Sequence, residues 1–516
     1  MDSKERTRTR ASADSSRATF SGAVLFYGLG ALLIFAPLFR GGYRPLPLLI
    51  MELAALLLLA GLAWKPLATG QALSWPLRVF LGLVLLLPLA QLLPVPMALW
   101  ADLPGRAFYA DALRQVGDAG AGFDWRAISL IPSATEAAWL ALLPPLAVFI
   151  VASRLDEQRL LILVLVFLGM AVGQALLGLI QYGDGPDSLF RLGNTWMAGS
   201  AVGTYVNRNS LAGLLEMALP LALALLVATV GHGTRYHVGR RRGLRQWLAR
   251  FSVARLNRAV LFGLAALVIL LGLIFTRSRT GVSMAMLGIL LCTLLLSNRL
   301  GGRNVYGLIG TFTAAGIGLA SLIGLAPVWS RFTYADPMED GRVKIFEATL
   351  QAIGQFFPFG TGAGTYQAVM HRFHPIDFPG LTINHAHNDY LEWILGNGLS
   401  AILLIAFWLL LYLRQWGRVW KHGDWQPFRF VQVGAGIALL LMMLHTLVDF
   451  NLHIPANAAF TAFLAALFLH RPLKEESRQS RQREQPDRSS SETVAERPVP
   501  PPREIPPENQ QNPFAL

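Results

Sequence analysis

Long apolar runs recur along this chain and limit, more than any other feature, what it can fold into. A helix needs about 20 mostly apolar residues to cross a bilayer. Twelve runs come close to that length and predict an all-α polytopic membrane protein with about 12 transmembrane helices. Only 15% of the 516 residues are charged, which excludes a soluble enzyme and a nucleic-acid-binding protein. The runs cover residues 22–39, 46–64, 77–94, 136–152, 159–181, 209–230, 259–276, 280–297, 305–326, 390–413, 430–449 and 455–470.

The positions of Lys and Arg predict the orientation of these helices, because inner loops carry an excess of positive charge. With an inner N-terminus, 31 of the 44 Lys and Arg residues fall on the inner side and 13 on the outer side. The Arg-rich segment at Arg240, Arg241 and Arg242 is the strongest inner anchor. We therefore expect both termini in the cytoplasm.

This layout predicts three parts of the chain. Residues 1–21 form a basic cytoplasmic tail, and no small-residue cleavage site ends the first apolar run, so we expect a retained helix there. Residues 22–472 form the transmembrane catalytic domain, which includes a large outer loop over 327–389. Residues 473–516 are rich in Pro, Arg, Glu, Gln and Ser and predict a disordered cytoplasmic tail. The single cysteine, Cys292, excludes an intramolecular disulfide.

Polar and ionisable residues gather near the outer ends of the predicted spans. Charge close to lipid is costly, so such residues are candidates for function. They come from five segments that the topology places on one side of the membrane, and we expect them to form one site there. The candidates are Arg191, Asn207, Arg208, Asn209, Arg277, Arg279, Arg342, His385, His387, Asn388 and Asp449.

The short turn TRSRTG holds Arg277 and Arg279 and has two interpretations. In the first, the arginines simply extend to lipid headgroups. Alternatively they bind an anion, because guanidinium groups match phosphate geometry and keep their charge. The outer location favours the second interpretation, since the charge rule disfavours Arg on that side.

The segment HAHND also has two interpretations. In the first, the segment only begins the next helix, because Asn388 and Asp389 are good N-cap residues. Alternatively His385 or His387 is a general base at the membrane surface, because imidazole titrates near neutral pH.

A zinc site in the outer loop is disfavoured. His371, His374, His385 and His387 fall in that loop, but their spacings are His-x₂-His and His-x-His, and no HExxH motif occurs. We predict no metal.

The glycine-rich segment GTGAGTY at 360–366 is predicted to be a turn and not a phosphate loop, because no βαβ unit surrounds it. The preceding residues Ile345, Thr349, Ile353 and Phe357 recur at four-residue intervals. That period predicts an amphipathic helix lying on the membrane surface.

Several of these motifs, in this order, resemble the bacterial O-antigen ligase and O-antigen polymerase superfamily. VNRNSLAGLLEMALPLAL (206–223) is similar to the family's Asn-x-Asn span, and TRSRTGV (276–282) to its Thr-x-Ser-Arg turn. GRVKIFEATLQAIGQFFPFGTGAGTYQ (341–367) is similar to its Arg-led loop helix, and HAHNDYLEWILGNGL (385–399) to its His-Asn motif. HTLVDFNLHIPANA (445–458) looks like a tail motif of one subgroup.

The resemblance implies a glycosyltransferase of the GT-C type in the bacterial inner membrane, with its active site facing the periplasm. Such an enzyme moves a glycan from undecaprenyl diphosphate to a sugar hydroxyl and needs no metal or other cofactor. Carried over by residue, the catalytic His is His387 and the turn Arg is Arg279, with His385 as a neighbour. The family's other Arg is either Arg208 or Arg191. Arg277 and Arg342 are further candidates for binding the donor diphosphate.

Two other functions stay open. The motifs do not separate a ligase, which moves a finished glycan to lipid A-core, from a polymerase, which joins lipid-linked repeat units. A secondary transporter also has about 12 spans. That function is disfavoured because transporters place ionisable residues near the midplane, and here they gather at the outer ends.

Overall fold

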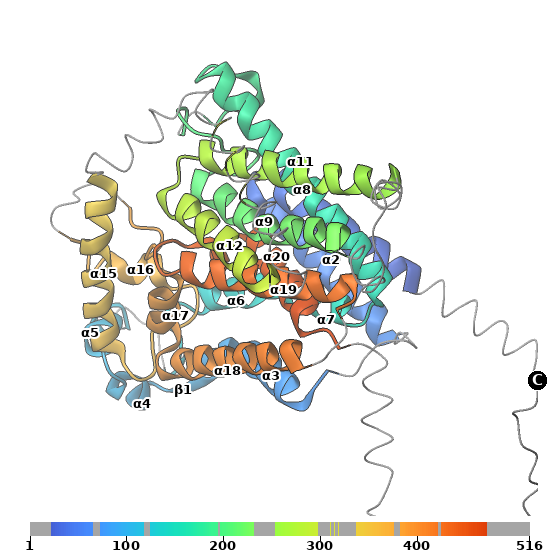
Figure 1. Ribbon diagram of the computed structural model, residues 1–516. Coiled ribbons are helices and arrows are strands. Elements are labelled where there is room, and N and C mark those ends of the chain that lie inside the picture. The colour runs from blue at the N-terminus through green and yellow to red at the C-terminus, as the bar shows by residue number, and fades with distance from the viewer. Residues whose placement is uncertain are drawn as a thin grey trace, which may run out of the picture. The chain divides into compact units, whose positions relative to one another are not determined.

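The computed structural model describes residues 22–64, 73–117, 124–194, 197–231, 253–297, 310, 314, 318, 337–375, 382–421 and 425–471. The chain divides into two units, Met1–His470 and Arg471–Leu516, and the elements below belong to the first. That unit is mostly helical (Figure 1). The predicted tails over 1–21 and 473–516 and the predicted span over 305–326 lie outside the described residues, apart from three isolated positions in that span.

The all-α polytopic membrane fold is confirmed. Eight described helices are long and apolar enough to cross a bilayer, and three shorter apolar helices accompany them. These eleven helices correspond to eleven of the twelve predicted spans. They are Gly22–Leu38, α2 Pro45–Trp64, α3 Trp75–Gln91, the pair α6 Pro132–Ala141 and α7 Leu143–Ser153, α8 Glu157–Asp184, α9 Arg208–Gly231, α11 Val253–Phe275, α12 Arg279–Ser297, α18 Leu399–Lys421, α19 Pro427–His445 and α20 Pro455–Leu469.

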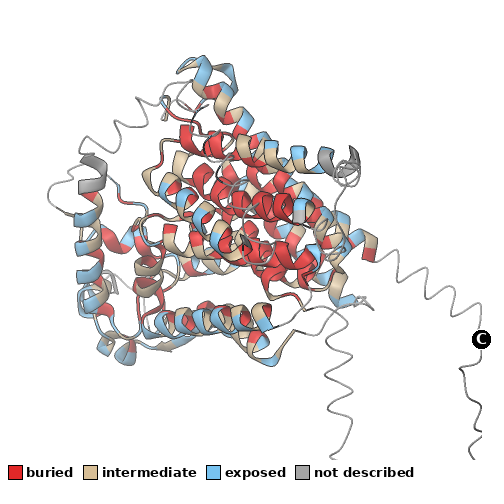
Figure 2. Ribbon diagram, in the orientation of Figure 1, coloured by how far each residue is buried: buried red, intermediate tan, exposed pale blue. Residues whose placement is uncertain are grey.

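Helix α9 lies at the centre of the main core. Its apolar window is 94% buried, against 78% for α19 and less than half for the other long helices. It packs against α19, α11, α12 and α8, and Figure 2 shows the buried residues concentrated there. Gly434 of α19 lets the two backbones approach, because a Cβ there would lie 2.9 Å from the Pro220 carbonyl oxygen. A helix that is apolar on every side needs such a central position.

A second, smaller core joins two segments that are far apart in the sequence. Residues 94–127 supply a short antiparallel strand pair, β1 Pro94–Pro96 and β2 Trp125–Ala127, and two helices between the strands, α4 Met97–Asp102 and α5 Ala107–Gly117. The large loop supplies α15 Pro337–Phe356, α16 Tyr366–Met370 and α17 Asp389–Asn397. Trp100, Ala110, Phe356, Met370 and Leu395 pack together in this core, so the loop has an apolar interior of its own.

The predicted amphipathic helix in the loop is present as α15, and part of its apolar side packs against protein. Thr349 and Ala352 of α15 are fully buried, and Phe356 is nearly so. Thr349 Oγ1 lies 3.0 Å from the Tyr366 hydroxyl oxygen. The apolar side of α15 therefore packs against α16 and α17.

The predicted span over 390–413 is interrupted at Gly398. This residue has φ 58° and ψ −138°, a backbone conformation that favours glycine. A Cβ there would overlap the Pro358 carbonyl oxygen. The chain therefore forms two helices, the nine-residue α17 and the long α18, and the histidine segment precedes the short one.

Candidate active site

Connections between helices meet at one end of the bundle, as the predicted topology requires. The Tyr43 hydroxyl oxygen, in the first connection, lies 3.1 Å from His385 Nε2. Arg277 Nη1 donates to the Gly199 carbonyl at 2.9 Å. The Asn209 amide donates to Asp449 Oδ2 at 2.6 Å. These contacts join segments of the chain that are up to 342 residues apart in sequence.

His387 has an unusual backbone conformation in this cluster. Its φ is 50°, in the left-handed region that few non-glycine residues adopt. Neighbouring hydrogen bonds hold the segment: the Ala386 N–H donates to Glu392 Oε2 at 2.9 Å, and the Asp389 N–H to the Thr446 carbonyl at 3.0 Å. Such conformations cost roughly 1–3 kcal/mol and concentrate at functional sites.

Asp449 is the carboxylate nearest to the His387 ring. Its Oδ1 lies 3.9 Å from His387 Nδ1, which is buried and has no closer polar partner among the described residues. Arg342 Nη2 lies 3.7 Å from Asp449 Oδ2 and its Nη1 donates to the Val448 carbonyl. Burial alone would raise the pKa of the Asp449 carboxyl, but His387, Arg342 and His445 outweigh it and hold the pKa well below its usual range. The site therefore keeps a carboxylate beside the imidazole.

His385 belongs to a second polar network, in which both of its ring nitrogens have partners. Nε2 lies 3.1 Å from the Tyr43 hydroxyl oxygen, and Nδ1 lies 3.1 Å from Glu392 Oε1. Its ring stacks on Phe450 at 4.4 Å, and the edge of His387 meets the same phenyl ring at 5.0 Å. The two histidines thus lie near one aromatic ring but differ in their hydrogen bonding.

His453 completes this second network. Its Nδ1 lies 2.6 Å from Asp389 Oδ1 and its Nε2 lies 3.2 Å from Glu392 Oε1. Burial lowers the pKa of His453, but Glu392 and Asp389 outweigh burial and raise it to about 9. Burial likewise raises the pKa of Glu392, and the nearby His453 and His385 outweigh it, so the net shift is downward. A cationic His453 therefore bridges two carboxylates at neutral pH.

Two hydroxyl side chains shape the turn that carries Arg277 and Arg279. Thr276 Oγ1 donates to the Leu273 carbonyl at the end of α11. Ser278 Oγ accepts the Gly281 N–H at 3.2 Å and caps the start of α12. A Cβ at Gly281 would lie 2.6 Å from Ala212 of α9, so the turn packs closely against the helix that carries Asn209.

The asparagine candidates divide into two roles. Asn207 and Asn388 cap helices: Asn207 Oδ1 accepts the Asn209 N–H, and Asn388 Oδ1 accepts the Tyr390 and Leu391 N–H groups. Asn209 instead contacts Asp449 directly. Arg208 is the first residue of α9, beside Asn209.

Arg191 donates its hydrogen bonds to backbone carbonyls. Its guanidinium bonds to Gln181, Gly185, Met197, Ala198 and Ser200, and the residue is 3% exposed. It therefore organises the connection between α8 and α9.

Sequence reasoning missed several participants in the site. Tyr43 and Glu392 lie in or beside apolar runs, and no local sequence pattern distinguishes them from residues without a role in the site. His445 is fully buried and its Nδ1 lies 2.8 Å from Glu216 Oε2 of α9. The sequence did offer one signal for this pair, because His445 and Glu216 are ionisable residues inside two apolar runs.

One group of described residues has the geometry to hold a metal ion. His385, Glu392 and His453 each offer one atom, and these atoms lie within 4.8 Å of one another. The same atoms are already hydrogen-bonded or ion-paired with each other. His371, His374, His385 and His387 do not form such a group.

The fold and the site define a polytopic helical membrane protein whose histidines, carboxylates and arginines meet at one end of the bundle. Residues 264–406 match the family described as O-antigen ligase. This segment is therefore similar to that family, which agrees with the resemblance and indicates a glycan ligase or polymerase. A search of curated proteins found no match. The matched segment contains Arg277, Arg279, Arg342, His385 and His387, whereas Asn209 and Asp449 join the site from outside it.

Proposed function

We propose that this protein is an O-antigen ligase of the bacterial inner membrane. It moves a glycan from undecaprenyl diphosphate to a sugar hydroxyl of lipid A-core on the periplasmic face. The observation that carries the proposal is the position of His387, in a left-handed conformation beside Asp449, inside a domain of this family. The density of Lys and Arg supports cytoplasmic termini and a periplasmic site.

His387 is the general base of the proposed reaction. It takes the proton of the acceptor hydroxyl as the oxygen attacks the anomeric carbon of the donor. Asp449 stabilises the imidazolium that forms, and it is held in place by Asn209 and Arg342. His385 has a positioning role, because both of its ring nitrogens already have partners.

Arginines stabilise the leaving group of the proposed reaction. As the new glycosidic bond forms, the bond from the anomeric carbon to the diphosphate oxygen breaks and its electron pair stays on the diphosphate. We assign Arg279 and Arg277 to that developing charge, with Arg208 and Arg342 nearby. Arg191 is not assigned to the diphosphate, because its donors bind backbone carbonyls. An in-line displacement of this kind inverts the anomeric configuration.

The arginines supply the positive charge that a metal ion would otherwise supply, so the proposed reaction is independent of metal. Transfer should continue at the same rate in the presence of EDTA. A loss that zinc or magnesium restores would instead assign a metal to His385, Glu392 and His453.

The test uses the full-length protein in lipid nanodiscs with an undecaprenyl-diphosphate-linked glycan. We expect lipid A-core to accept the glycan, and His387→Ala to reduce the rate by about 10²–10⁴-fold. The matched control is His371→Ala, an exposed histidine of the same loop. Extension of the lipid-linked glycan without transfer to lipid A-core would assign the chain as a polymerase. Full activity of His387→Ala would refute the base assignment.

A further inference from the structure

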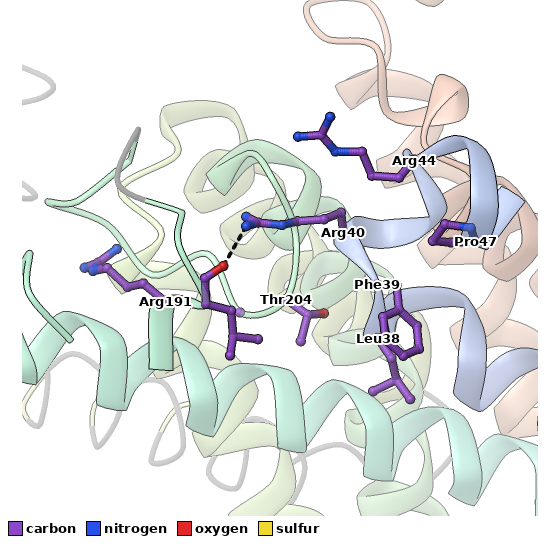
Figure 3. Close-up of a pocket in the computed structure, with 9 residues that line it drawn as sticks. Leu38, Phe39, Arg40, Arg44, Pro47, Arg191 and Thr204 are labelled. Atoms are coloured by element: carbon purple, nitrogen blue, oxygen red, sulfur yellow. Dashed lines mark hydrogen bonds between the residues drawn. The ribbon is translucent and has the colours of Figure 1, made fainter. Parts of the chain in front are cut away.

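A cavity of about 260 Å³ lies between the first interhelical connection and the segment before α9. The first connection and the end of the helix before it supply Leu38, Phe39, Arg40, Arg44 and Pro47, and the segment before α9 supplies Arg191, Leu192, Gly203 and Thr204. Figure 3 shows Arg40 reaching across to the carbonyl oxygen of Leu192, with Leu38 and Phe39 on the same connection. Neither the family match over 264–406 nor the proposed transfer reaction uses these residues.

The charge around the cavity has one sign. Arg40, Arg44 and Arg191 line it, and none of the residues that line it is acidic. Arg40 Nη2 donates to the Leu192 carbonyl at 2.8 Å, so its guanidinium is held in position. Arg44 is exposed, and its guanidinium makes no hydrogen bond or ion pair with the described residues. Arg40 is held in position and Arg44 is exposed, and no acidic residue lines the cavity, so the cavity favours binding of an anion.

The rim of the cavity is apolar and open. Phe39 is 53% exposed, Leu192 65% and the nearby Leu189 91%. In a protein that crosses a bilayer, apolar side chains exposed near the ends of the spans lie at the boundary between lipid headgroups and acyl chains. An anion that binds here is therefore attached to a hydrocarbon chain, as in a phospholipid.

We propose that this cavity binds the phosphate headgroup of an anionic glycerophospholipid of the surrounding bilayer. Arg44 and Arg40 hold the phosphate, and the acyl chains lie along Phe39 and Leu192. The cavity is smaller than the roughly 300–1,000 Å³ of sites that enclose drug-sized ligands. Its size suits a phosphoglycerol headgroup.

A lipid bound in the cavity should also affect the active site. Tyr43 lies between Arg40 and Arg44 in the sequence, and its hydroxyl contacts His385. A bound headgroup that fixes both arginines restricts the same short connection, and therefore steadies the contact of Tyr43 with His385. Anionic phospholipid should accordingly increase the transfer rate.

The test measures binding of phosphatidylglycerol to the full-length protein by native mass spectrometry from detergent. Arg44→Gln and Arg40→Gln should each weaken binding about tenfold, as expected for loss of one charge-assisted hydrogen bond. Arg44→Lys should retain most of the affinity. Leu38→Trp, which fills the cavity and keeps both charges, should also release the lipid. The control is Arg414→Gln, an exposed arginine near the end of α18 and outside the cavity.

Competing molecules separate the sources of the phosphate. Phosphatidylcholine and inorganic phosphate should displace phosphatidylglycerol at least tenfold less well. Equal competition by inorganic phosphate would overturn the lipid assignment. Displacement by undecaprenyl diphosphate that depends on Arg44 would assign the cavity to the donor and would also overturn the proposal. Unchanged phosphatidylglycerol binding in Arg40→Gln, Arg44→Gln and Leu38→Trp would show that the lipid binds elsewhere. These readouts do not require transferase activity, so they stand whether or not the proposed reaction is correct.

Discussion

Replacing Asp449 by Asn tests the electrostatic core of the proposed mechanism. The substitution keeps the shape of the side chain and removes one negative charge 3.9 Å from His387 Nδ1. Two unit charges at that distance interact by about 4 kcal/mol at the effective dielectric near a protein surface. The imidazole is 22% exposed, so water screens part of this interaction. Since each 1.4 kcal/mol is a tenfold change, we expect kcat to fall roughly 10- to 100-fold.

The split between kcat and KM separates this electrostatic role from a structural one. Asp449 stabilises the imidazolium that forms as the proton is taken, so its loss should lower kcat and leave the donor KM within a few-fold. The assay is transfer in nanodiscs over a range of donor concentrations, followed on gels.

Asp156→Asn is the matched control, because this carboxylate caps α8 by accepting the Arg159 N–H and takes no part in the site. It should leave both kcat and the donor KM unchanged. If Asp449→Asn retained the wild-type kcat, or raised the donor KM without lowering kcat, the assignment of Asp449 as the partner of His387 would be refuted.

Three further predictions concern the turn, the second network and the break between α17 and α18. Arg279→Lys should reduce kcat about 10- to 100-fold and leave the donor affinity within a few-fold of the wild-type value, because the group acts mainly in the transition state. Weaker donor binding with a normal kcat would contradict this assignment. His453 has a raised pKa of about 9, so it contributes at most roughly 3 kcal/mol to the free energy of unfolding. This contribution is complete below pH 6.5 and is lost as the pH rises to about 9. Thermal unfolding of His453→Gln should lack this pH dependence, and an unchanged dependence would contradict the assignment. Gly398→Ala should lower the free energy of unfolding, measured in nanodiscs, by at least about 1–3 kcal/mol. The control Gly354→Ala should not destabilise the fold, because the space around Gly354 is open. Equal stability of the two variants would contradict the account.

The apolar runs were enough to predict the helices, and the charge distribution gave a prediction of the membrane side at which the polar residues gather. Both patterns depend on local composition, which a sequence shows directly. The motif around His387 was equally visible. The two cores were not predicted, because hydropathy does not show that Ala348 and Phe356 of α15 pack against protein instead of lipid.

The sequence also could not predict which residues contact each other within the site. Tyr43 contacts His385 across 342 residues, and Asn209 contacts Asp449 across 240. The second pair is set by the packing of α9 against α19, and no spacing in the chain encodes either pair. Arg191 looked like a diphosphate ligand because it is a positive charge near the site, but only its hydrogen bonds reveal its contact with five carbonyls.

The most direct test of the account is the glycan profile of a strain in which this gene is deleted and replaced by the wild type or His387→Ala. Lipopolysaccharide is separated on a gel beside the extracted lipid-linked glycans. We predict bare core and accumulated long lipid-linked glycan in the deletion strain and in the His387→Ala strain, and normal lipopolysaccharide with the wild-type gene. Unchanged glycans in the deletion strain, or full restoration by His387→Ala, would contradict the account.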